Sequence, residues 1–222
     1  RSLIVAGEPN SIFFEIYLKS LKKNKYKSPL ILIASENLLL KQMKKLNLKM
    51  RIRILKIQNI KNNKLNNKTI NLINIKYSQK KAFEKISKKS NNYISKSFLV
   101  AIKLLKNGFS NKLINGPISK KNFLSGKYLG VTEYISNKFS SKKNCMLIYN
   151  KELSVCPITT HLPLKQVAKN INKKLISQKI ILINEFYKKK FKFIPNIAVL
   201  GLNPHCESIH KFNEDEIGRA HV

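Results

Sequence analysis

Two of the four histidines in this sequence stand in unusual surroundings and could bind one metal ion together. His161 lies in Thr159-Thr160-His161-Leu162-Pro163-Leu164, and His205 ends Gly201-Leu202-Asn203-Pro204-His205. Imidazole is the commonest protein ligand of divalent transition metals. Each histidine follows an apolar run typical of a β-strand, and open α/β sheets bind their ligands beyond the carboxyl ends of the strands. If both strands end at the same edge, the two imidazoles can share one ion.

The spacing of these histidines leaves a second interpretation open. They are too far apart for a local zinc-finger clasp and can meet only through the fold, so two separate loop histidines fit the spacing as well. A catalytic zinc typically has three protein ligands and one open position, so the pair would also need a third ligand. His210 is interpreted as a solvated loop residue, and His221 is given no functional weight.

Two turns carry residue types that suit a phosphate or a carboxylate. Asn115-Gly116-Pro117-Ile118-Ser119-Lys120 combines a small-residue turn, a predicted helix start and a lysine, and the backbone N–H groups of a helix start attract anions. Thr132 follows Gly130 in the first turn of another predicted helix, where its hydroxyl could hold a substrate. Ordinary helix capping accounts for both turns as well. Lys120 and Thr132 are therefore the candidate substrate-binding residues, and no residue is assigned a catalytic or cofactor-binding role.

The net charge of +33 would ordinarily indicate a nucleic-acid or membrane partner, but the kind of basic residue argues against both. Only four of the 44 basic residues are arginine, whose planar guanidinium suits bidentate contacts with phosphates and guanine. Lysine is accompanied by abundant asparagine and isoleucine, as in proteins of A/T-rich genomes. Compositional drift in such a genome is therefore favoured as the origin of the high positive charge. The alternative from another class, a lysine-rich nucleic-acid-binding module, would gather lysines and exposed aromatics on one face.

The cysteine spacing and the hydropathy of the chain indicate its cellular compartment. Cys145, Cys156 and Cys206 show no Cys-x-x-Cys spacing, which disfavours both a disulfide framework and a zinc ribbon. No uncharged apolar stretch approaches the roughly 20 residues that span a bilayer, and the sequence starts without a signal-peptide pattern. We expect a soluble protein in a reducing cytoplasm, with no membrane partner.

Apolar runs alternate with helical periods along the chain. The runs predict strands at residues 2–6, 29–34, 51–57, 69–75, 145–149, 153–157 and 197–202, with a further strand ending near residue 115. The periods predict helices at residues 12–21, 36–46, 81–105 and 130–139, and two more between residues 164 and 191. Such alternation predicts a layered α/β/α fold with a largely parallel sheet. No repeat or linker marks an internal domain boundary.

Four motifs together give the chain a resemblance to the 4-hydroxythreonine-4-phosphate dehydrogenase family, the NAD-dependent enzymes of pyridoxal 5′-phosphate biosynthesis. In the family's order they are Gly7-Glu8-Pro9, Gly116-Pro117-Ile118-Ser119-Lys120 and the two histidine motifs, of which the last two are specific. The resemblance covers roughly the first two thirds of a family member. Residues 1–216 are therefore expected to be the N-terminal part of such a dehydrogenase. Residues 217–222 read like a translated sequencing adapter and are expected to be a non-native tail.

The resemblance implies an α/β/α fold related to isocitrate and isopropylmalate dehydrogenases, in a homodimer with the active site at the subunit interface. It implies three histidine ligands to a zinc, magnesium, cobalt or manganese ion; His161 and His205 match two, and the partner subunit supplies the third. The implied reaction oxidises 4-phosphooxy-L-threonine by hydride transfer to NAD and then decarboxylates it to 3-amino-2-oxopropyl phosphate. Because the third ligand and much of the NAD site would lie beyond this sequence, the fragment alone is expected to be inactive.

Two departures from the family bear on the substrate. The family usually reads Gly-His-Thr-Glu where this chain has Gly130-Val131-Thr132-Glu133, so only Thr132 carries over as a substrate residue. The opening turn reads Asn10-Ser11-Ile12-Phe13-Phe14 where the family tends to have Ala-Gly-Ile-Gly-Pro. The alternative substrate is therefore a related four-carbon sugar-acid phosphate, threonate or erythronate 4-phosphate.

Overall fold

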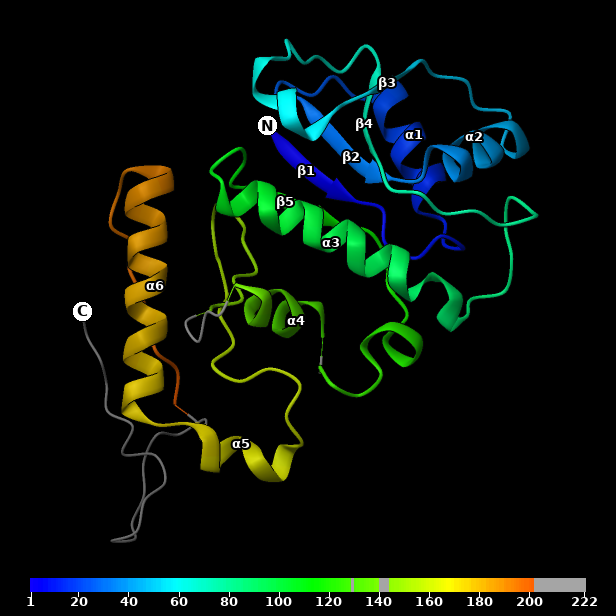
Figure 1. The fold of residues 1–222 in the computed structure, drawn as a ribbon. Coiled ribbons are helices and arrows are strands. Elements are labelled where there is room, and N and C mark those ends of the chain that lie inside the picture. Colours follow the sequence, from blue (N-terminus) through cyan, green and yellow to red (C-terminus); the bar gives the residue numbers. More distant parts are fainter. Residues whose placement is uncertain (129, 140–143, 202–222) are drawn as a thin grey trace, which may run out of the picture. The chain divides into compact units, whose positions relative to one another are not determined.

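The computed structural model describes residues 1–128, 130–139 and 144–201 (Figure 1). The chain divides into an N-terminal unit, Arg1–Phe139, and a C-terminal unit, Ser140–Val222. Composition did not mark this boundary, because lysine and asparagine are abundant on both sides of it.

A five-stranded parallel sheet is the centre of the N-terminal unit. The strands lie in the order β3-β4-β2-β1-β5, and every neighbouring pair is parallel. Their bounds are β1 Ser2–Val5, β2 Leu30–Ala34, β3 Ile52–Ile54, β4 Ile70–Asn74 and β5 Leu113–Asn115. The predicted parallel sheet is confirmed, although β3 is shorter than the run at residues 51–57 suggested.

Helices cover both faces of this sheet, because successive strand residues point to opposite sides. Leu3 and Val5 share a core with Phe98 of α3, whereas Ile4 shares a second core with Leu18 of α1 and with α2. Helix α3 therefore covers one face of the sheet, and α1 and α2 cover the other (Figure 1). The helices are α1 Phe13–Lys23, α2 Glu36–Lys45, α3 Asn91–Lys106 and α4 Val131–Lys138, with a π-helix, η3, at Lys120–Leu124 and 3₁₀ turns η1 Ile57–Asn62 and η2 Lys88–Ser90. The layered α/β/α architecture is thus confirmed.

The long helix predicted from residue 81 begins later than expected. Ser87 accepts a hydrogen bond from the Lys89 amide and starts η2, and α3 follows at Asn91. Phe83 and Ile86, which fitted the helical period, are exposed rather than packed in the core. Their spacing matched a helix by coincidence of composition, since apolar residues are frequent throughout the chain.

The C-terminal unit is mostly helical among the residues described. It contains α5, Leu164–Asn170, and α6, Lys173–Phe191, as the sequence predicted. The two strands expected at residues 145–157 are reduced to one antiparallel bridge between Ile148 and Val155, and no strand is assigned at residues 197–200. These strand predictions were wrong because an apolar run needs a hydrogen-bonding neighbour to become a strand. No helix in the described ranges is long and apolar enough to cross a membrane.

Candidate functional site

The turns that follow β1 and β5 interlock at the carboxyl edge of the sheet. These strands are neighbours, yet β1 leads to α1 on one face while β5 follows α3 on the other, so the sheet reverses its winding between them. In open α/β sheets such a switch point is the usual ligand site. The Gly7 and Gly116 motifs, far apart in sequence, therefore meet where a substrate site is expected.

Only glycine fits at the two positions where these turns touch. Gly7 has a φ of +76°, and a Cβ there would lie 2.3 Å from the Pro117 carbonyl oxygen. A Cβ on Gly116 would lie 2.1 Å from the Ala6 carbonyl oxygen. The Glu8 amide donates a hydrogen bond to the Pro117 carbonyl at 2.7 Å. The absence of a side chain at Gly7 and Gly116 thus allows the two backbone segments to approach each other closely.

Glu8, which the sequence offered only as part of the Gly7-Glu8-Pro9 motif, places a buried carboxyl group at this junction. Its side chain is 3% exposed, and its Oε2 accepts a hydrogen bond from the Ser90 hydroxyl at 3.1 Å. Burial raises the pKa of Glu8, while hydrogen bonds from Ser90 and the Asn10 amide oppose the rise. Its position directly after the first strand, in a chain with 11 acidic residues, was the available signal.

Asn10 gives a structural reason for the unusual opening turn. Its Oδ1 accepts hydrogen bonds from Gln79 Nε2 at 2.9 Å and from the Glu84 amide at 2.8 Å. Gln42, also buried, donates from Nε2 to the Pro9 carbonyl at 2.8 Å. These amide side chains fasten the β1–α1 turn to the loop at residues 79–84, so Asn10 stabilises the turn through its own contacts.

A cavity of about 440 Å³ lies beyond the carboxyl ends of β2 and β4. Its lining includes Ser35, Glu36, Asn74 and Tyr77. These polar groups already bind one another: the Ser35 hydroxyl donates to the Tyr77 carbonyl at 2.8 Å, and the Glu36 amide donates to Asn74 Oδ1 at 3.0 Å. These four lining residues are therefore joined in two hydrogen-bonded pairs.

Lys120 and Thr132 both stand at helix starts in the N-terminal unit, as predicted. Lys120 is the first residue of η3, its side chain is exposed, and Ser119 caps that turn through the Asn122 amide. Thr132 is the second residue of α4 and is also exposed. The residue before α4, Gly130, offers no side-chain cap, so the first-turn amides of α4 remain available to an anion.

His161 lies in the C-terminal unit with an exposed side chain and a φ of +59°. A positive φ is uncommon outside glycine and costs on the order of 1–3 kcal/mol. The surrounding structure therefore imposes the left-handed backbone conformation of this residue. The histidine follows a bend rather than the strand expected before it. His205 lies outside the described residues, so its pairing with His161 stays a prediction.

The described residues do not form a metal centre by themselves. Within residues 1–128, 130–139 and 144–201, no group of three or more histidine, cysteine, aspartate or glutamate side chains is placed to hold an ion. The exposed imidazole of His161 has the right donor chemistry for one ligand position.

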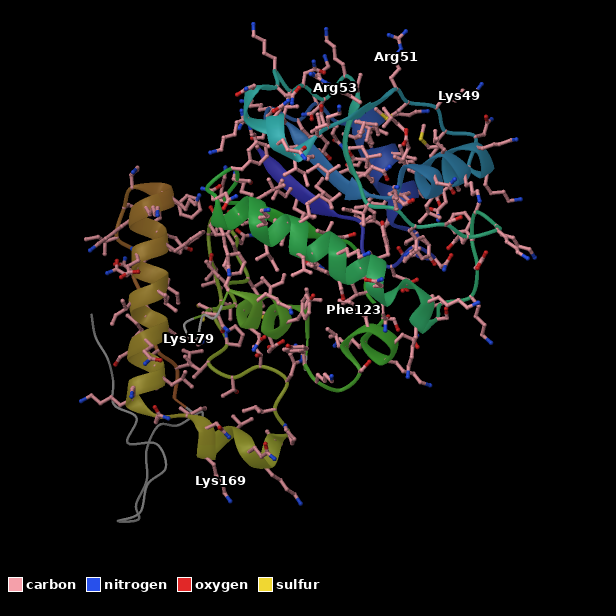
Figure 2. The ribbon with its side chains drawn as sticks, in the orientation of Figure 1. Lys49, Arg51, Arg53, Phe123, Lys169 and Lys179 are labelled. Carbon is pink, nitrogen blue, oxygen red and sulfur yellow. The ribbon has the colours of Figure 1, made fainter. Side chains whose placement is uncertain are left out.

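The basic side chains project from many elements of the molecule. In Figure 2, Lys49 and Arg51 extend outward at one end of the N-terminal unit, and Lys169 extends from α5 of the C-terminal unit. Arg53, near Arg51, donates hydrogen bonds to the Lys64 carbonyl and to Asn63 Oδ1. The one ion pair among the described residues joins Lys19 to Glu15 at 2.5 Å. This scatter fits the compositional explanation of the charge better than a nucleic-acid-binding face.

The chain is similar to proteins of one family over nearly its whole length. The family profile described as "Pyridoxal phosphate biosynthetic protein PdxA" matches residues 25–219. Two relatives named 4-hydroxythreonine-4-phosphate dehydrogenase, from Aquifex aeolicus and a Sulfurihydrogenibium species, are 30% and 33% identical over 96% of this chain. The chain spans 66% of the length of each of these relatives.

Solved structures agree with the sequence comparisons. A chain from Salmonella typhimurium has a TM-score of 0.84 at 23% identity over 96% of this chain and 66% of its own length, which supports the fold alone. The 4-hydroxythreonine-4-phosphate dehydrogenase of Klebsiella pneumoniae has a TM-score of 0.79 at 25% identity, covering 91% of this chain and 64% of its own.

Proposed function

Because the chain belongs to the family of the pyridoxal phosphate biosynthetic protein PdxA, we propose that it is a metal- and NAD-dependent 4-hydroxythreonine-4-phosphate dehydrogenase. The observation that carries the proposal is the match to the family over residues 25–219, which includes both histidine motifs. The reaction would convert 4-phosphooxy-L-threonine into 3-amino-2-oxopropyl phosphate and CO₂. The proposal includes a cytoplasmic homodimer with its active site at the subunit interface.

The N-terminal unit supplies the groups that would hold the anionic parts of the substrate. The exposed ammonium of Lys120 attracts phosphate or carboxylate, and the uncapped first turn of α4 presents amide N–H groups of the same polarity. The Thr132 hydroxyl can donate a hydrogen bond to a substrate oxygen beside that turn. The lysine-rich surface raises the local concentration of a phosphorylated substrate.

His161 and His205 would hold the divalent ion, with the third ligand from the partner subunit. A divalent ion at this place would lower the pKa of the substrate hydroxyl and stabilise the enolate formed when CO₂ leaves. NAD would accept the hydride, and this chain would supply position and electrostatic field. The role of His161 is to present its imidazole from a backbone conformation that the fold already imposes.

Val131 favours a second substrate class within the same family. It packs against the core cluster that contains Phe98 and Tyr134, at the position where the family usually has a substrate-binding histidine. An apolar side chain there removes one hydrogen-bonding group from the substrate site. A dehydrogenase of threonate or erythronate 4-phosphate is therefore the second candidate.

The test is NADH formation by the gene product at its natural length, offered 4-phosphooxy-L-threonine or threonate 4-phosphate. We expect turnover of the first substrate, loss of turnover with a chelator and recovery when a divalent metal is restored. Turnover of threonate 4-phosphate alone would establish the second candidate. Absence of metal-dependent turnover with either substrate would refute the proposed activity.

A further inference from the structure

Two cysteines of the C-terminal unit lie close enough to react with each other. The Sγ atoms of Cys145 and Cys156 are 3.1 Å apart, and both residues are free thiols. Both side chains are partly exposed, so a small reagent can reach them. They stand on either side of the bridge between Ile148 and Val155, whose two backbone hydrogen bonds measure 2.8 and 2.9 Å.

The segment that carries these cysteines, residues 144–156, is held against α6 at two points. Lys179 of α6 donates a hydrogen bond from Nζ to the Asn144 carbonyl at 2.6 Å (Figure 2 labels Lys179). The Tyr187 hydroxyl, also of α6, donates to Ser154 Oγ at 3.0 Å. The fold therefore keeps the two thiols together, which raises the effective concentration of one at the other.

We propose that Cys145 and Cys156 are a reversible dithiol–disulfide pair, oxidised by small-molecule disulfides such as oxidised glutathione. In the first step the Cys145 thiolate attacks a sulfur of the reagent, whose S–S bond breaks and releases one thiol. In the second step Cys156 loses its proton and attacks the Cys145 sulfur, releasing the second thiol. The two protein thiols are oxidised by two electrons, and one disulfide reagent is reduced to two thiols.

The surroundings of the thiols assign the two roles. Burial, the hydrogen bond with Cys145 and the charge of Cys145 raise the pKa of the Cys156 thiol to about 12, while Lys179 opposes the rise. Cys156 therefore stays protonated at neutral pH and resolves the mixed disulfide. Once Cys145 is bound to the reagent, the Coulombic effect of Cys145 that raises the pKa of Cys156 is absent, which removes one obstacle to deprotonating Cys156.

The disulfide would act on the segment that leads to His161. Cys156 is followed by Pro157 and the Thr159-Thr160-His161 motif, so a cross-link at Cys156 limits how far this segment can move. The bond itself does not depend on the proposed enzymatic activity. It can be tested on the protein without substrate or cofactor.

Mapping by proteolysis tests the pair directly. The reduced protein is treated with oxidised glutathione and a chelator, blocked with iodoacetamide and cut with trypsin without reductant. Because lysines stand at positions 143, 151 and 165, Cys145 and Cys156 fall on the separate peptides 144–151 and 152–165. We expect these peptides to be recovered joined, with a mass lower by the two hydrogens lost, and separated again by dithiothreitol.

Matched variants distinguish this pair from general thiol reactivity. Cys206→Ser should leave the joined peptides unchanged, and Cys156→Ser should accumulate glutathione on Cys145. Recovery of peptides 144–151 and 152–165 singly, alkylated or each carrying glutathione, would overturn the proposal. Joining of either peptide to the one that contains Cys206 would overturn it as well.

Discussion

The two units of the chain reach their folded states by different means. The N-terminal unit buries side chains on both faces of a parallel sheet, in two cores that hold most of its strand residues. In the C-terminal unit, the buried hydrophobic residues among those described are Ile176 and Tyr187, and ring contacts around α6 such as Tyr149 with Phe191 at 5.1 Å hold its parts together. The candidate substrate groups therefore stand on a well-packed scaffold and His161 on a lightly packed one.

A core truncation should give the largest contrast between the units. Phe98 is 0% exposed and packs on Tyr134 with ring centroids 5.3 Å apart, so Phe98→Ala should lower the free energy of unfolding by about 4 kcal/mol. Leu164 in the C-terminal unit is 88% exposed, and Leu164→Ala should change the free energy of unfolding by less than about 0.5 kcal/mol. Urea unfolding measures both. Similar losses would show that the two units do not differ in packing.

The glycine junction should be nearly as sensitive as the core. Gly116→Ala forces a methyl group against the Ala6 carbonyl and should cost about 3 kcal/mol, because backbone must move to admit it. Gly108→Ala is the matched control, since it meets nothing within 4 Å and should cost about 1 kcal/mol for its φ of +68°. Thermal unfolding compares them. Equal costs would mean that the two motif turns do not need their close approach.

Loss of a helix cap should lower stability by a smaller amount, and that amount should differ between the two units. Ser35 is 1% exposed, accepts from the Leu38 amide and donates to Tyr77, so Ser35→Ala should cost about 2 kcal/mol. Asn172 caps α6 through the Leu175 amide at an exposed position, and Asn172→Ala should cost about 1 kcal/mol or less. Chemical denaturation of both variants tests the order. The reverse order would contradict the difference in burial.

The buried carboxyl of Glu8 makes one part of the N-terminal unit sensitive to pH. Because burial raises the pKa of Glu8, the folded state holds the proton of this carboxyl group more tightly than the unfolded state does. The protonated carboxyl therefore contributes to the free energy of unfolding in acid, and this contribution is lost as pH rises through the folded pKa. Ser90→Ala removes a hydrogen bond that favours the carboxylate, and should cost about 1 kcal/mol at neutral pH and less in acid. Urea unfolding midpoints of both proteins, measured from acid to neutral pH, give the cost of Ser90→Ala at each pH.

A neutral hydrogen bond provides the control for that pH series. Ser97, also buried, donates to the Tyr93 carbonyl at 2.8 Å. The cost of Ser97→Ala should stay the same from acid to neutral pH. If Ser90→Ala also shows a constant cost, the Glu8 carboxyl does not change its protonation over this range.

The sequence predicted the N-terminal unit well because its structure follows local patterns. Predominantly apolar runs became β1, β2 and β4, as is typical of buried parallel strands, and Ser35 caps α2 as its position suggested. The junction of Gly7 with Gly116 was not predictable in this way, since it joins turns from distant parts of the chain. The amide network of Asn10 depends on distant partners for the same reason.

The local structure around the candidate residues was predictable to a different extent in each unit. The helix starts at Lys120 and Thr132 were predicted because such starts leave a local signature of small and polar residues, and the role of both residues in substrate binding stays a prediction. The strand expected before His161 failed because residues 145–157 find a partner at one bridge alone among the described residues. The left-handed backbone of His161 carries no sequence signal, since non-glycine residues adopt it only where surrounding structure imposes it.

The most direct test of the account is the metal content of the protein at its natural length, measured after dialysis against limiting chelator for the unmodified protein, His161→Ala and His210→Ala. If His161 is a metal ligand, His161→Ala should bind the ion at least about 100-fold more weakly, more than a change around the ligands typically costs. His210→Ala should bind as the unmodified protein does. Equal metal retention by His161→Ala and the unmodified protein would contradict the assignment of His161 to the metal site.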